Sequence, residues 1–117
     1  MEIIARSAGR FEYEGPDELR TLVIDALHQV VDPEVALDIV EVGLVYRVEV
    51  PPAPQPVQVR MTMTSAACPV ADVIMEDVQH YLAQALPERE DAEIDLVWEP
   101  AWTPERLSTS AKRFMGW

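Results

Sequence analysis

The sequence predicts a small α+β domain, in which helices cover one face of a mixed three-stranded sheet. Its 117 residues are about one ordinary domain in length, and 49% of them are hydrophobic. Two stretches repeat apolar residues at helical spacing, and three shorter stretches alternate apolar and polar residues as strands do. The expected order is helix, strand, strand, helix, strand, helix, with residues 1–15 as an N-terminal extension and residues 16–117 as the domain.

The first helix is expected over residues 16–31. Its apolar residues form one stripe, made of Leu19, Leu22, Val23, Ala26, Leu27 and Val30. Pro16 suits a first helical turn, and a residue that precedes proline avoids helical backbone, so Asp32-Pro33 should end the helix. His28 lies opposite the stripe and is expected at the solvated surface. The extension could supply an edge strand or a docking arm, using Ile3, Ile4, Phe11 and Tyr13.

Two alternating segments, residues 44–50 and 57–64, predict a pair of strands. The proline-rich segment between them, residues 51–56, lacks most backbone donors and should be a stiff connection, so an antiparallel hairpin is the simplest arrangement. Gly43 can supply a positive φ just before the first strand.

The second half of the chain predicts a helix over residues 69–86, a strand over 92–98 and a short last helix over 104–115. His80 lies away from the apolar stripe of its helix and should be exposed. Three tryptophans fall near the C-terminus, at positions 98, 102 and 117. Packing in the core is the simplest role for them, and a cover over a pocket or a docking surface is the alternative.

The charge of the chain restricts its partners and its location. The formal net charge is −12, which disfavours binding to nucleic acid or to an anionic membrane surface. A single cysteine cannot form an internal disulfide, which fits a reducing compartment. The first ten residues resemble no secretory signal, and no apolar run approaches the roughly 20 residues of a membrane span. A cytoplasmic protein is therefore expected.

The one cysteine, Cys68, stands where a strand is predicted to run into a helix. Unpaired N–H groups and the positive end of the helix dipole gather at such a junction and favour the thiolate, which attacks electrophiles and binds soft metals. A free cysteine is also often a small buried hydrophobe, and the two interpretations carry about equal weight here.

Hydroxyl and carboxyl groups are expected around this cysteine. Thr64 and Ser65 precede it, and their hydroxyls could hold an anion or a ligand. Three acids, Asp32, Glu34 and Asp38, lie in the connection that enters the first strand, which an antiparallel hairpin brings beside the end of the second. These acids could be hard metal ligands or proton acceptors for the thiol, or they could cap turns through side-chain to backbone bonds.

Common catalytic patterns are absent from the sequence. It has no glycine-rich phosphate loop, no Cys-x-x-Cys and no His-Glu-x-x-His, so a self-contained zinc or iron–sulfur site is not expected from these motifs. A Cys–His pair would need His28 or His80 beside Cys68, and both histidines are expected on polar helix faces. A protein that is not an enzyme is the prediction.

Three elements of the sequence match the pattern of one known family. Residues 32–34 (Asp-Pro-Glu) and 38–46 resemble its Asp-Pro-Glu…Ile-Val-x-Leu-Gly-Leu-Val signature. Residues 61–69, ending in Cys-Pro, are similar to its Thr-x-x-x-Cys-Pro element, and residues 97–102 to its Val-Trp-x-Pro-x-Trp element. In these elements the chain resembles the metal–sulfur cluster biosynthetic family, which includes SufT, the PaaD-like proteins and the eukaryotic cytosolic iron–sulfur assembly relatives. The segment after Glu34 departs from the pattern, because the family often has a glycine and an asparagine before Ile-Val.

This resemblance implies an iron–sulfur cluster assembly-type fold and a role in the maturation of iron–sulfur proteins. It makes Cys68 the functional centre and places around it Asp32, Glu34, Asp38 and Thr64. The expected cargo is iron or an iron–sulfur cluster, held transiently. One thiolate cannot supply the four ligands that a [2Fe–2S] cluster normally takes, so a homodimer, or a complex with a client or scaffold protein, is expected. The alternatives are a PaaD-like factor of phenylacetate breakdown, a non-metal adaptor with a structural cysteine, and a thiol enzyme.

Overall fold

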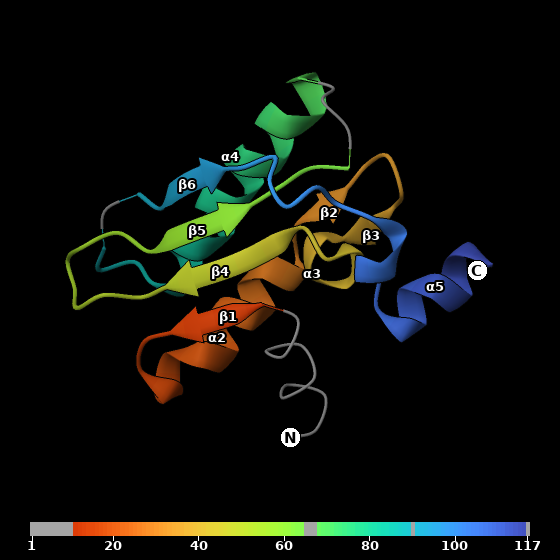
Figure 1. Ribbon diagram of the computed structural model, residues 1–117. Helices are drawn as coiled ribbons and strands as arrows, with labels where there is room; N and C mark the ends of the chain where they lie inside the picture. Colours follow the sequence, from red (N-terminus) through yellow and green to blue (C-terminus); the bar gives the residue numbers. More distant parts are fainter. Residues whose placement is uncertain (1–10, 65–67, 90, 117) are drawn as a thin grey trace.

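The computed structural model describes residues 11–64, 68–89 and 91–116, without the side chains of Cys68, Pro69 and Met115, and within them a four-stranded sheet carries two long helices on one face (Figure 1). In chain order the elements are β1 (Glu12–Glu14), α2 (Asp17–His28), β2 (Val31–Asp32), β3 (Leu37–Asp38), α3 (Ile39–Val42), β4 (Val45–Glu49), β5 (Gln58–Met61), α4 (Cys68–Ala85), β6 (Glu93–Leu96), the 3-10 turn η1 (Pro104–Arg106) and α5 (Thr109–Met115).

The strands of the main sheet lie in the order β1-β4-β5-β6. The predicted hairpin is confirmed, because β4 and β5 are antiparallel, while β1 joins β4 and β6 joins β5 in parallel. The predicted three-stranded sheet is wrong in its strand number, since β1 adds a fourth strand from the extension. The edge strand that the extension could supply is therefore present, although it is not counted in the predicted sheet, and it is held to β4 by ion pairs from Arg47 to Glu12 and Glu14. Ile3 and Ile4 lie outside the described residues.

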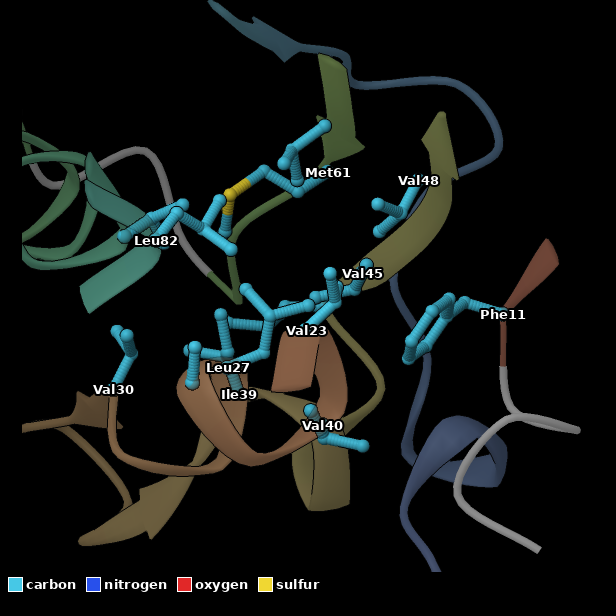
Figure 2. Close-up of a cluster of buried hydrophobic side chains, with 14 of the residues drawn as sticks. Phe11, Val23, Leu27, Val30, Ile39, Val40, Val45, Val48, Met61 and Leu82 are labelled. Atoms are coloured by element: carbon cyan, nitrogen blue, oxygen red, sulfur yellow. The ribbon is translucent and has the colours of Figure 1, made fainter. Parts of the chain in front are cut away.

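The two faces of the sheet differ as the period-two pattern requires. On β5, Val59 and Met61 are buried, whereas Gln58 and Arg60 are exposed. Figure 2 shows the buried side, where Val45 of β4 and Met61 of β5 face Val23 of α2. The core therefore lies between the sheet and the helices, and the opposite face is charged and open to solvent.

Helices α2 and α4 pack against each other and against this apolar face (Figure 1). Most of their predicted stripes are buried, through Val23, Ala26 and Leu27 on α2 and Ile74, Val78 and Leu82 on α4. The prediction is wrong at Leu22 and Val73, which are exposed, and Ile24 is buried although it is not assigned to the stripe. A fully buried side chain of this size stabilises the fold by about 1.5–3 kcal/mol, which is why packing rather than helix propensity holds these helices in place. None of the helices in the described ranges is long and apolar enough to cross a membrane.

The connection between α2 and β4 contains more regular structure than the sequence indicates. The first helix ends at His28 rather than at residue 31, because Val31 and Asp32 pair with Asp38 and Leu37 in a two-stranded antiparallel hairpin. Helix α3 follows directly and ends at Gly43, whose φ of 84° confirms the predicted left-handed residue before the strand.

The C-terminal segment crosses α3 and β4 and is fastened there by side chains. The indole nitrogen of Trp102 donates to the carbonyl of Val42 at 2.8 Å, and Arg106 donates to the carbonyl of Gly43 at 2.7 Å. Trp102 also packs against the core, whereas Trp98 is 47% exposed. The predicted last helix is divided, since residues 104–106 form a 3-10 turn and α5 begins after Ser108, which caps it.

Candidate functional site

The candidate site lies where the chain leaves β5 on its way to α4. The backbone N–H of Thr62 donates to the carbonyl of Leu44 at 2.8 Å, so the chain still runs alongside the start of β4 one residue after β5 ends at Met61. Two residues later Thr64 reaches the hairpin formed by β2 and β3. Residues that are about 30 positions apart in the sequence therefore meet at this end of the sheet.

The Thr64 hydroxyl lies between two of the predicted carboxylates. Its oxygen is 3.1 Å from Oε1 of Glu34 and 3.4 Å from Oδ2 of Asp32. A hydroxyl donates a single proton, so it can satisfy only one of these two acceptors at a time. Three of the predicted site residues, Asp32, Glu34 and Thr64, are thus in direct contact.

Asp32 is fully buried, and its environment favours the protonated acid. Burial raises the pKa of the Asp32 carboxyl above its ordinary value, and the charge of Glu34 acts in the same direction. Two hydrogen bonds oppose this shift, from the Glu34 N–H at 2.9 Å and from the Thr64 hydroxyl. The result is a carboxylate with more affinity for a proton than a solvated aspartate has.

The backbone that carries these acids forms a tight turn. The N–H groups of Val35 and Ala36 both donate to the carbonyl of Asp32, at 3.2 and 2.8 Å. Ala36 has a φ of 61°, which is left-handed backbone that costs a residue with a side chain roughly 1–2 kcal/mol. The departure from the family pattern in this segment therefore coincides with local backbone strain.

Asp38 lies on the other face of the β2–β3 hairpin. Val31 pairs with Asp38 and Asp32 pairs with Leu37, and successive residues of a strand point to opposite faces. The Asp38 carboxylate instead caps α3, accepting from the N–H groups of Val40 and Glu41 at 3.0 Å each. The same oxygen is 3.1 Å from Nδ1 of His28. The structure thus brings together Asp32, Glu34 and Thr64, and it places Asp38 in a different group.

The expectation of a solvated His28 is wrong, because 27% of its side chain is exposed and its ring is bonded to Asp38. That hydrogen bond raises the pKa of His28 above its usual value, although burial acts against it. A histidine in the last turn of a helix, ten residues before a helix-capping aspartate, was the available signal in the sequence. His80 is exposed as predicted, and its ring contacts Gln84.

The predicted thiol lies at the boundary of what the structure describes. Helix α4 begins at Cys68, as the strand-to-helix interpretation requires. It has 18 residues, and the positive end of its dipole lies at this N-terminus. The Cys68 side chain lies outside the described part of the structure, and so does Ser65. Their roles therefore stay predictions.

The chain matches the iron–sulfur cluster assembly protein family over residues 20–96, a range that contains Asp32, Thr64 and Cys68. It belongs to that family. The resemblance predicted from the three sequence elements is confirmed.

Two relatives in this family carry the name Fe-S protein maturation auxiliary factor. YitW of Bacillus subtilis is 42% identical over 100 residues, which cover 86% of this chain and 96% of the relative. SufT of Staphylococcus aureus is 42% identical over 87 residues, which cover 74% of this chain and 97% of the relative.

Two solved structures share the fold. A domain of unknown function from Bacillus anthracis is 41% identical and superposes with a TM-score of 0.72 over 82% of this chain and 89% of that one. A conserved hypothetical protein from Thermotoga maritima is 34% identical, with a TM-score of 0.69 over 89% of this chain and 97% of that one. The small mixed α+β architecture is therefore that of the family.

Proposed function

We propose that this member of the iron–sulfur cluster assembly protein family is an accessory factor that helps to assemble iron–sulfur clusters or to transfer them to client proteins. It would act by binding and release rather than by turning over a small substrate. The names of the YitW and SufT relatives support this proposal, since both are called maturation auxiliary factors. Service to general assembly is preferred over a PaaD-like role in phenylacetate breakdown.

One observation carries the proposal for the site, namely the Thr64 hydroxyl shared by Asp32 and Glu34 four residues ahead of the first residue of α4. The helix start favours a thiolate at Cys68, and Asp32, a carboxylate whose pKa is raised by burial, is the candidate acceptor for the proton that the thiol releases. Carboxylate oxygens and a thiolate together offer both hard and soft ligands to iron. Thr64 and Ser65 would contribute hydroxyls to the cargo.

A single cysteine determines how a cluster can be held. A [2Fe–2S] cluster takes four ligands, and this chain supplies one thiolate, with the carboxylates of Asp32 and Glu34 as further candidates. The remaining ligands must come from a second copy, a small thiol or the client. A homodimer or a transient complex with a client or scaffold protein is the arrangement we propose, and the acidic surface favours basic partners.

The test is anaerobic reconstitution with ferrous iron and sulfide, followed by absorption spectra and native mass measurement. We expect the wild type to take up iron and sulfide and to transfer them to an apo-client, and Cys68→Ser to do neither. Uptake and transfer by Cys68→Ser at the wild-type level would overturn the proposal.

A matched pair of acid substitutions separates the site from the general charge of the protein. Glu34→Gln removes a charge beside Thr64, whereas Glu93→Gln removes one from the exposed strand β6. We expect transfer to be slower in Glu34→Gln and unchanged in Glu93→Gln. Equal effects in the two variants would mean that net charge, and not this site, governs transfer.

A second candidate, a non-metal adaptor, is favoured by the exposure of one tryptophan. Trp98 is 47% exposed while Trp102 is bonded to Val42, so of these two tryptophans Trp98 is the one available for docking. In the adaptor, maturation of the client survives Cys68→Ser and fails in Trp98→Ala. The opposite result is expected for the cluster-binding factor.

A further inference from the structure

A second group of metal-ligating side chains lies on the other face of the β2–β3 hairpin. It consists of His28 in the last turn of α2, Asp38 at the N-cap of α3 and Glu41 in the first turn of α3. One ligand atom from each residue can be chosen so that all three lie within 4.8 Å of one another. Two separate helices therefore deliver one imidazole nitrogen and two carboxylates to the same place.

The spacing of these atoms is close to that of a metal site. Two ligands bound to one zinc ion at about 2.1 Å and at a tetrahedral angle are about 3.4 Å apart. Nδ1 of His28 and Oδ1 of Asp38 are 3.1 Å apart, so the imidazole and the carboxylate already lie at close to this separation. No two of the three ligand atoms are more than 4.8 Å apart, so none has to move by more than about 1.4 Å to reach the spacing of a zinc site.

Each carboxylate is oriented by a bond outside the group. Asp38 accepts from two backbone N–H groups through Oδ1, and Glu41 accepts the hydroxyl proton of Ser108 through Oε1. A carboxylate has a second oxygen, so these orienting bonds are compatible with binding an ion. Such supporting bonds hold metal ligands in place in known sites.

The electrostatics of the group also favour a cation. The side chains of His28 and Asp38 are only 27% and 20% exposed, so water weakens the electrostatic interactions of these groups less than at an open surface. The Asp38 and Glu41 carboxylates both lie within 4.8 Å of the imidazole nitrogen, and their negative charges favour a cation at this place. The same field acts on a divalent ion, and the remaining exposure leaves room for water as a further ligand.

We propose that His28, Asp38 and Glu41 form a binding site for a divalent first-row transition metal ion of the Zn²⁺ and Fe²⁺ type. The imidazole nitrogen favours such ions over Mg²⁺ and Ca²⁺, which prefer oxygen ligands alone. The site is separate from Cys68, and it stands whether or not the chain handles iron–sulfur clusters. A bound ion would connect the C-terminal end of α2 to the N-terminal end of α3.

The test measures Zn²⁺ binding by calorimetry on metal-free, tag-free protein in which Cys68→Ser has removed the thiol. We expect one Zn²⁺ per chain, with an affinity lowered roughly 10- to 100-fold by His28→Gln and by Glu41→Gln. The amide oxygen of Glu41→Gln can still accept from Ser108, so this variant keeps the supporting bond. Circular dichroism checks that every variant is folded.

Two control variants locate the bound ion. His80→Gln removes the exposed histidine and Glu34→Gln changes the opposite face of the hairpin, so neither should affect Zn²⁺ binding. His80→Gln also leaves His28 as the only histidine of the chain, so its imidazole ¹⁵N resonances identify it without ambiguity. We expect Zn²⁺ to shift the Nδ1 resonance. Absence of Zn²⁺ binding, wild-type affinity in either His28→Gln or Glu41→Gln, or loss of binding in Glu34→Gln would overturn the proposal.

Discussion

The two faces of the β2–β3 hairpin carry polar groups of different character. On one face the buried Asp32 meets Glu34 and Thr64. On the other, the half-buried Asp38 meets His28 and caps a helix. The two aspartates are only six residues apart, and both could have been assigned to one site from sequence.

The difference follows from the geometry of a strand. Paired residues of an antiparallel hairpin share a face, and neighbours along a strand do not. Asp32 is therefore on the face of Leu37, where the segment leaving β5 arrives, and Asp38 is on the face of Val31, beside the end of α2. A hairpin of two-residue strands is enough to separate one acidic segment into two groups with separate chemistry.

The largest effect is expected from Asp32→Ala. This change leaves the Glu34 N–H without its buried acceptor, so the free energy of unfolding should fall by about 1–3 kcal/mol. Asp32→Asn keeps an acceptor oxygen and should cost less. Urea denaturation of the three proteins measures the difference, and wild-type stability in Asp32→Ala would mean that Asp32 does not hold the turn.

A smaller loss is expected on the other face. Asp38→Ala removes the N-cap of α3 and should lower the free energy of unfolding by about 0.5–2 kcal/mol. Asp38→Asn keeps a good cap but removes the charge that faces His28, so it should recover most of this loss. If asparagine is as costly as alanine, the contact with His28, and not the cap, is the dominant contribution of Asp38.

A substitution in the turn between β2 and β3 is expected to stabilise the protein, whereas the two substitutions above destabilise it. Ala36→Gly relieves the left-handed strain at a φ of 61° and should raise the free energy of unfolding by about 0.5–1 kcal/mol, after the entropy cost of glycine is subtracted. Ala101→Gly, in an exposed segment, is the matched control and should be neutral or slightly destabilising. A destabilised Ala36→Gly would show that the turn is not strained.

The smallest effect is a dependence of stability on pH that differs between the faces. His28 and Asp32 both have raised pKa values, so each binds protons more strongly in the folded state, and its contribution to stability is lost as the pH rises through the folded pKa. For Asp32 this loss begins near pH 3.8, and for His28 near pH 6.5, the ordinary values.

Denaturation at several pH values in metal-free protein tests this difference. In His28→Gln the free energy of unfolding should no longer fall as the pH rises above 6.5, but it should still fall above pH 3.8. In Asp32→Asn the fall above pH 3.8 should be absent and the fall above pH 6.5 should remain. A curve for His28→Gln that parallels the wild type throughout would mean that the bond to Asp38 does not contribute to stability.

The sequence determined those parts of the fold that depend on local patterning. The stripes of α2 and α4, the hairpin of β4 and β5 around its proline-rich connection, and the positive φ of Gly43 could all be predicted, because periodicity and the special backbone of proline and glycine act over a few residues. The start of α4 at Cys68 and the grouping of Asp32, Glu34 and Thr64 at one end of the hairpin followed from that topology together with the family resemblance.

Only the tertiary structure decided which short segments pair and which side chains meet. The sequence allows the extension to be an edge strand or a docking arm, and the pairing of β1 with β4 through Arg47 decides between them. The two residues of β2 carry too little pattern to be identified, and the assignment of Asp38 to His28 depended on the register of the small β2–β3 hairpin. A shift of one residue there exchanges the two faces, and the register is set by the turn together with the burial of Asp32 and the packing of Leu37 against the core.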